Sequence, residues 1–185
     1  MTSINLSQAL KRRTRDRFEA LQEDKEGLAA VEFALIAVPF FTLLFGIIEV
    51  CLLFTANTVL DHAINEAARD IRTGKIQASG SPESTFRTAV CDEITVLLTC
   101  DADRLFVDAD EFDDFTSVSL AQPTWNGSSL DGLAPFNPGA DDKIVVVRGF
   151  YRWTLFTPII SQPLVNIDTS DHLLQATVAF RNEPF

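Results

Sequence analysis

The chain has 185 residues and a formal net charge of −11, from 15 lysine and arginine residues and 26 aspartate and glutamate residues. This length provides one modest domain in addition to any membrane segment, and so acidic a chain repels phosphate backbones, which argues against nucleic acid as a partner. The charge is unevenly placed. Residues 1–27 hold six basic and five acidic residues, whereas residues 28–185 hold nine and twenty-one.

A long apolar run follows the polar leader. The stretch Phe33–Ile48 carries no charge, and only Glu49 interrupts its continuation to Phe54. As a helix, these residues would span roughly 33 Å, enough to cross a bilayer core of about 30 Å. We therefore predict a single transmembrane helix, assigned to residues 28–56.

A basic cluster before this run, Lys11–Arg17, indicates the orientation. By the positive-inside rule, the leader lies in the cytoplasm and residues 57–185 form a domain outside it. A cleaved secretory signal peptide fits less well. Its apolar run is usually only about 7–15 residues long, and no clear Ala-x-Ala site follows the run here.

Two helices are predicted around the membrane boundary and beyond it. Apolar residues recur at helical spacing over residues 57–73, so the membrane helix is expected to continue as an amphipathic one that ends near Gly74. Within the membrane half, Pro39 is a candidate kink. A second helix is predicted over residues 82–98, with Ser81 as its N-cap.

The remaining sequence favours β-structure. Four strands are predicted within residues 104–181, from short patterns beside an acidic turn and longer runs of β-branched and aromatic residues: 105–109, 115–120, 144–156 and 173–181. Residues 122–142 are dense in Gly, Pro, Asn and Ser, which is typical of a long surface loop. We therefore predict an α+β domain, in which the helices pack on a small antiparallel sheet.

The three cysteines have different expected roles. Cys91 and Cys100 lie nine residues apart in the domain placed outside the cytoplasm, where disulfides persist, so a disulfide is the simplest interpretation. Two buried free thiols are the alternative. Cys51 lies inside the membrane run and is interpreted as a small apolar filler.

No pattern in the sequence indicates catalysis or a metal site. An acidic cluster fails the EF-hand pattern, because Phe112 and Asp113 stand where an oxygen ligand and a glycine are required, and a solvated turn is the preferred interpretation. His62 and His172 are isolated, and the chain has no nucleophile elbow and no Cys-x-x-Cys pair. We expect no enzymatic activity, no cofactor and no metal. The cluster consists of Asp108, Asp110, Glu111, Asp113 and Asp114.

Two carboxylates lie in or beside the apolar run, where a charge costs about 2.5–3.5 kcal/mol on insertion scales. Glu49 is interpreted either as a second intramembrane acid or as a residue near the outer boundary that reaches headgroups or water. Glu32 is different, because cleavage after Gly27 would create an α-ammonium group on Leu28, about 6 Å along the helix axis. Pairing between Glu32 and this group, on the same chain or on a neighbour, would set the axial register of a helical array.

A resemblance to the prepilin peptidase site of type IV pilin-like proteins is carried by the run Gly27-Leu28-Ala29-Ala30-Val31-Glu32-Phe33 and the apolar residues that follow. With Pro39, Gly46-Ile47-Ile48-Glu49 and Ala67-Ala68-Arg69, the segment resembles the TadE-like pseudopilins, minor components of the bacterial Tad (tight adherence, Flp) pilus machinery. The resemblance covers about residues 27–73, and a weaker one extends to Phe180–Phe185.

The resemblance implies cleavage between Gly27 and Leu28 by a membrane prepilin peptidase, with Glu32 and Phe33 at the assembly and register positions. It implies a minor pilin or pseudopilin that helps to initiate or cap the fibre at the inner membrane. The implied partners are the peptidase, the major Flp pilin and other minor pilins, the inner-membrane Tad assembly platform and the lipid bilayer. Two alternatives stay open: an uncleaved single-pass scaffold of the assembly machinery, and a periplasmic or surface adhesion module.

Overall fold

The structure is a computed structural model that describes residues 25–157, 160–167 and 170–185. The chain divides into two compact units, residues 1–45 and 46–185, and one helix, α2 (Lys25–Arg72), contributes residues to both. In the first unit, the described residues are all helical, and Pro39 lies within the helix. The predicted leader lies outside the described residues as far as residue 24.

In the second unit, α2 buries one face. Its buried apolar residues recur at intervals of three and four positions, which is the spacing that places side chains on one side of a helix. They are Leu53, Ala56, Leu60, Ala63, Ile64, Ala67, Ala68 and Ile71. The helix ends at Arg72, and Gly74 adopts a φ of 78° and donates its N–H to the carbonyl oxygen of Ile71 at 3.0 Å. Glycine adopts this left-handed conformation at little cost, so it closes the helix.

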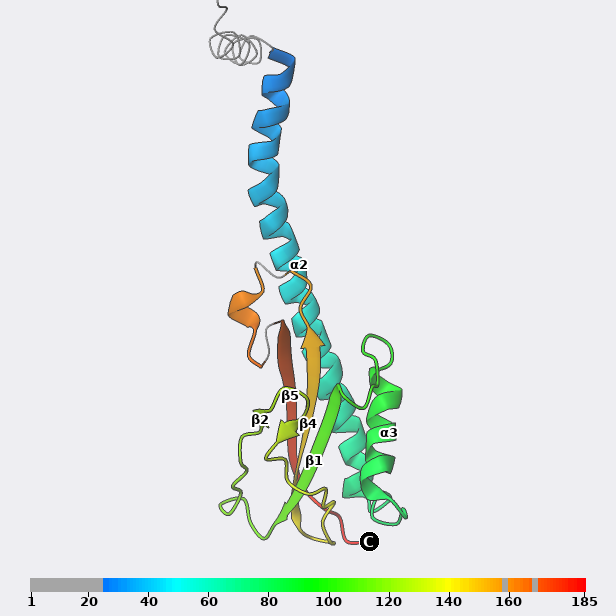
Figure 1. The fold of residues 1–185 in the computed structure, drawn as a ribbon. Helices are drawn as coiled ribbons and strands as arrows, with labels where there is room; N and C mark the ends of the chain where they lie inside the picture. Colours follow the sequence, from blue (N-terminus) through cyan, green and yellow to red (C-terminus); the bar gives the residue numbers. More distant parts are fainter. Residues whose placement is uncertain (1–24, 158–159, 168–169) are drawn as a thin grey trace, which may run out of the picture. The chain divides into compact units, whose positions relative to one another are not determined.

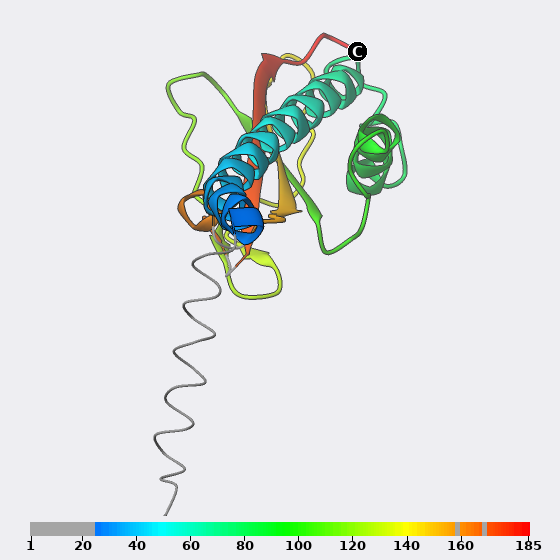
Figure 2. The same ribbon diagram turned by 90° about the horizontal axis from the view of Figure 1, so that it is seen from above.

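The second helix, α3 (Pro82–Ile94), packs beside α2, as Figure 1 and Figure 2 both show. It buries Phe86, Val90 and Ile94. Ser81 occupies the N-cap position, but its side chain makes no capping hydrogen bond. The helix ends at Ile94, four residues before the predicted end, because a turn follows in which the N–H groups of Leu97 and Leu98 both bond to the carbonyl of Ile94.

The main sheet has three antiparallel strands in the order β1-β4-β5. These are β1 (Leu105–Phe112), β4 (Ile144–Thr154) and β5 (Asp171–Arg181). A separate two-stranded ribbon consists of β2 (Thr124–Trp125) and β3 (Leu130–Asp131), and a 3₁₀ helix, η1 (Gln162–Leu164), lies between β4 and β5. The predicted α+β fold class is thereby confirmed.

One face of the central strand β4 packs against the helices. Its residues on this face belong to the same buried cluster as residues of α2 and α3, and they are Val145, Val147, Tyr151 and Trp153. Gly149 lies among them and allows α2 to come close, because a Cβ atom at this position would be 2.3 Å from Cδ1 of Ile64. The contact between α2 and the sheet therefore depends on a residue without a side chain.

The opposite face of the sheet holds a buried ion pair. Arg148 on β4 lies directly opposite Asp108 on β1, and their side chains are 3% and 1% exposed. Arg148 donates through Nε to Oδ1 of Asp108 at 2.9 Å and through a second nitrogen to Oδ2. Both side chains also bond to the loop that follows β1. Arg148 donates to the carbonyl oxygen of Ala121 at 2.8 Å, and Asp108 accepts the N–H of Ala134 at 3.1 Å. The ion pair therefore holds this loop against the sheet.

The strand predicted over residues 115–120 is not formed. Instead, β1 continues to Phe112, and the chain turns at Asp114, whose carboxylate accepts the backbone N–H groups of Thr116 (2.8 Å) and Ser117 (2.9 Å). The pKa of Asp114 is lowered by the hydroxyl hydrogen bond of Thr116 and then by these two N–H groups. Such local aspartate bonds compete with extended backbone, which explains the turn.

Candidate functional site

The predicted cleavage site lies in the first turn of α2. Gly27 is the third residue of this helix and is exposed, and a Cβ atom built on it would meet nothing within 4 Å. Helix ends fray, so a bond between Gly27 and Leu28 lies where the backbone opens most easily. Further along the helix, Glu32 and Phe33 are both exposed. Within the described part of the chain, Glu32 forms no ion pair or hydrogen bond.

The part of α2 around these residues exposes large apolar side chains. They include Phe33, Leu35, Ile36, Val38, Phe40, Leu43 and Phe45. Among the described residues, one helix is long and apolar enough to cross a membrane, and it lies near the N-terminus. The helix is compatible with single-pass membrane anchoring.

Glu49 lies on the same helix, but its surroundings are different. Its side chain is buried, and it accepts hydrogen bonds from the segment that follows β4. One carboxylate oxygen accepts the backbone N–H groups of Phe156 and Thr157, the latter at 3.3 Å, and the other accepts the hydroxyl of Thr157. The structure thus places this carboxylate among protein donors. Sequence reasoning missed Thr157 because it lies 108 residues from its partner and no local pattern connects the two.

The family model described as TadE-like protein matches residues 27–69. This segment is TadE-like. The match confirms the resemblance predicted from the sequence, and it suggests involvement in Tad pilus assembly together with other pilus components. It begins at Gly27 and contains every predicted N-terminal site residue, namely Gly27, Leu28, Glu32, Phe33 and Glu49. No curated protein and no solved structure matches the chain.

The cysteine pair lies outside the TadE-like segment. Cys91 and Cys100 form a disulfide that links the last turns of α3 to the segment before β1, with their Cα atoms 5.5 Å apart. Cys51 lies within the TadE-like segment as an exposed free thiol. The disulfide closes a short loop, for which the chain-entropy model gives a stabilisation somewhat below about 3 kcal/mol.

The side chains of the acidic cluster defined above do not point to a common centre. Asp108 pairs with Arg148, the side chain of Glu111 accepts the N–H of Ala140 at 3.1 Å, and Asp113 pairs with Lys143 at 2.6 Å. The hydrogen bond and the charge of Asp113 raise the pKa of Lys143. Within the described ranges, no group of three or more metal-ligating side chains is present.

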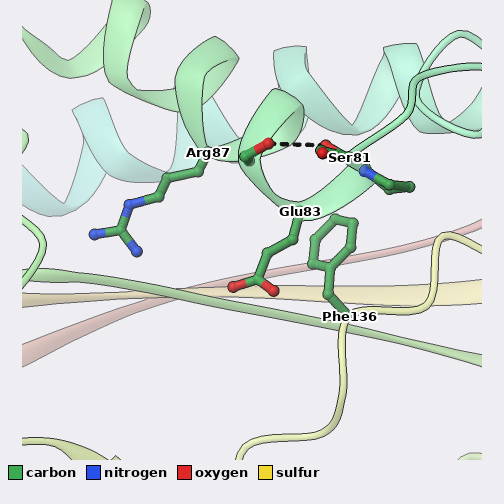
Figure 3. A pocket seen from close by; sticks show the side chains of 6 residues that line it. Ser81, Glu83, Arg87 and Phe136 are labelled. Carbon is green, nitrogen blue, oxygen red and sulfur yellow. Dashed lines mark hydrogen bonds between the residues drawn. The ribbon is translucent and has the colours of Figure 1, made fainter.

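Outside the TadE-like segment, an open hollow of about 480 Å³ lies at the start of α3 (Figure 3). It is lined by Ser81, Pro82, Glu83, Ser84, Arg87 and Phe136. Of its two serine hydroxyl groups, that of Ser84 donates to the carbonyl oxygen of Ser81 at 3.0 Å. Neither histidine is among its lining residues: His62 is exposed on α2, and Nδ1 of His172 contacts the carbonyl oxygen of Leu164. Among the residues that line this hollow, no histidine is present to act as a base for either serine.

Proposed function

We propose that the protein is a minor pilin or pseudopilin of the Tad pilus, which helps to initiate or cap pilus assembly at the bacterial inner membrane. Its role is structural rather than enzymatic. One observation carries the proposal: the TadE-like match begins at Gly27, the residue before the predicted cleavage point, and covers a helix with exposed apolar side chains. A major Flp pilin is a much shorter chain, so the folded domain favours a minor component.

In this proposal, the chain has three parts. Residues 1–27 are a cytoplasmic leader that the prepilin peptidase removes, residues 28–56 span the inner membrane, and residues 57–185 form a periplasmic domain. The basic cluster Lys11–Arg17 supports this orientation by the positive-inside rule. The assembled subunit would contact the Tad assembly platform, the major pilin and other minor pilins, and it could be carried into the extracellular pilus.

The chemistry of assembly follows from the exposed carboxylate of Glu32. In hydrocarbon, a charge without a partner is costly, and Glu32 has none within the described part of the chain. Cleavage would release an α-ammonium group on Leu28, one helical turn away. Pairing of Glu32 with the same group of a neighbouring subunit would remove this cost and fix the axial register, while exposed apolar side chains exchange lipid contacts for helix contacts.

The cleavage is tested by the mass of the protein from cells with and without the prepilin peptidase. We expect a loss of residues 1–27 and a new terminus at Leu28, carrying an N-methyl group or not, only where the peptidase is present. The Gly27→Val variant should stay uncleaved, because the peptidase loses its glycine while the fold meets no clash at this position. Gly80→Val is the matched control, since a Cβ atom at Gly80 also meets nothing within 4 Å. An uncut chain in piliated cells would exclude the pseudopilin and favour the uncleaved scaffold.

Replacement of Glu32 tests the register role separately. The Glu32→Ala variant should insert into the membrane normally and undergo cleavage, but the amount of pilus recovered from the cell surface should fall sharply, because the lost interaction lies between subunits. Glu66→Ala is the control, since Glu66 is a half-exposed carboxylate on the same helix with a partner, Arg69, at 3.6 Å. Equal amounts of pilus in the wild type and Glu32→Ala would contradict the register role.

A further inference from the structure

The unexplained feature of α2 is a buried carboxylate inside its predicted membrane span. The exposed fraction of Glu49 is 2%, although the neighbouring Ile48 and Phe54 are 46% and 68% exposed. An acid in such a position normally faces water or a charged partner. Here no cation contacts it within the described residues. Its neighbours are hydrogen-bond donors from one irregular segment of the chain.

These donors all belong to the residues just after β4. Leu155 still donates its N–H to the carbonyl of Ser170 at 2.9 Å, in the manner of a strand. The next two residues, Phe156 and Thr157, have left the sheet, and their N–H groups bond to Glu49 instead, together with the Thr157 hydroxyl. The carboxylate therefore satisfies the backbone donors that the end of the strand leaves open.

A second contact holds the same segment on the helix one turn earlier. Gly46 is buried, and a Cβ atom on it would be 2.9 Å from Cγ2 of Ile160. Because Gly46 has no side chain, this isoleucine methyl group can pack directly against the helix backbone. Figure 1 shows the residues that directly follow β4 beside α2. The contacts with Gly46 and Glu49 place the segment beside a turn of the helix that exposes Ile47 and Ile48.

The segment exposes one large aromatic side chain. Phe156 is 67% exposed, and its ring lies edge-on to that of Trp153 at 5.9 Å. Trp and Tyr side chains are enriched where a membrane meets water, and Phe is common on the lipid-facing side of helices that lie in this interface. Irregular backbone enters the apolar zone only if its polar groups have partners within the protein. Glu49 provides such partners here.

We propose that the residues Leu155–Thr157 and Ile160, which we call the β4 exit segment, rest in the outer boundary of the lipid bilayer beside α2. Phe156 contacts lipid, Ile160 fills the space at Gly46, and Glu49 supplies the acceptors that the backbone needs there. The partner of this surface is the bilayer interface itself. The inference rests on the proposed membrane span, and it adds a second point of membrane contact to the helix.

The test places a spin label at residue 156 of the full-length chain in phospholipid vesicles. The background variant is Cys51→Ser, which removes the free thiol and leaves the disulfide intact. In Phe156→Cys, oxygen should reach the label several-fold more readily than a water-soluble nickel chelate does. Phe115→Cys is the matched control, because Phe115 is also exposed, at 61%, but follows the end of β1 that pairs with the start of β4. A label at residue 156 as accessible to nickel as that at residue 115 would overturn the inference.

The role of the carboxylate is tested in the same samples. Glu49→Ala should make the label at residue 156 more mobile and more accessible to nickel, and Glu66→Ala should leave it unchanged. Thr157→Val, which removes only the hydroxyl donor, should act in the same direction to a smaller extent, and near-ultraviolet circular dichroism verifies that the domain is folded. An unchanged label in both Glu49→Ala and Thr157→Val would overturn the role of Glu49. Cleavage at Gly27 is measured in parallel. Normal cleavage together with a water-exposed label at residue 156 would contradict this inference alone. A lipid-exposed label at residue 156 on a chain that stays uncleaved in cells would contradict only the proposed function.

Discussion

The Asp108→Asn variant is expected to lower the free energy of unfolding of the domain by about 3–5 kcal/mol, because it leaves one buried charge without its partner. Arg148 is only 3% exposed, so water cannot replace the lost carboxylate. Arg148 also holds the carbonyl of Ala121, and Asp108 holds the N–H of Ala134. The loop that covers this face of the sheet would therefore loosen together with the pair.

The measurement is denaturant unfolding of the full-length chain in detergent micelles, followed by tryptophan fluorescence. Trp125 lies in the affected loop, and Trp153 lies in the core on the other face. Asp113→Asn is the matched control, because it breaks an exposed ion pair: the side chain of Asp113 is 84% exposed and that of Lys143 is 42% exposed. This variant should lower the free energy of unfolding by at most about 1 kcal/mol. Similar losses in the two variants would show that the burial of the Arg148 pair has no energetic consequence.

The second large effect is expected from Gly149→Ala. The new methyl group would occupy the space of the Ile64 side chain, whose Cδ1 and Cγ1 atoms would be 2.3 and 2.7 Å away. Overpacking of this kind costs about 1–3 kcal/mol of stability. The helix α2 would have to move away from the sheet, or Ile64, which is fully buried, would have to leave its rotamer.

A double-mutant cycle identifies this cause. Ile64→Val alone should cost about 0.5–1.5 kcal/mol, because it removes one buried methyl group. In the double variant, the alanine methyl group fills part of the space that Ile64 leaves, so the total loss should be smaller than the sum of the two single losses. Losses that simply add would mean that Gly149 and Ile64 do not compete for the same space. Thermal or denaturant unfolding in micelles provides the numbers.

The features that the sequence predicts well are those that depend on local patterns. Helical periodicity marks the buried face of α2, and β-branched residues mark β4 and β5, because neighbouring side chains decide both. A glycine inside a strand pattern is itself a signal of close backbone approach, so the role of Gly149 could have been predicted. The residues of the N-terminal site lie in one short run, so the TadE-like resemblance can be recognised from the sequence.

The features that the sequence does not predict depend on distant partners. Arg148 and Asp108 are 40 residues apart, and Glu49 meets its donors 107 and 108 residues later. The misplaced strand over residues 115–120 has a local cause of another kind, since the side-chain bonds of Asp114 outweigh the β-propensity of its neighbours. The predicted surface loop over residues 122–142 in fact contains the β2–β3 ribbon.

The burial of α2 also changes where the folded domain begins. Glu49, Leu53 and Ala56 are all within the core or its contacts, yet they precede residue 57, where hydropathy alone would start the domain. Over the same turns, Cys51 and Phe54 face outward. One side of these turns thus packs against the folded domain, and the other side exposes an apolar surface that is suited to lipid. A water-soluble fragment cut at residue 57 would lack part of its own interior.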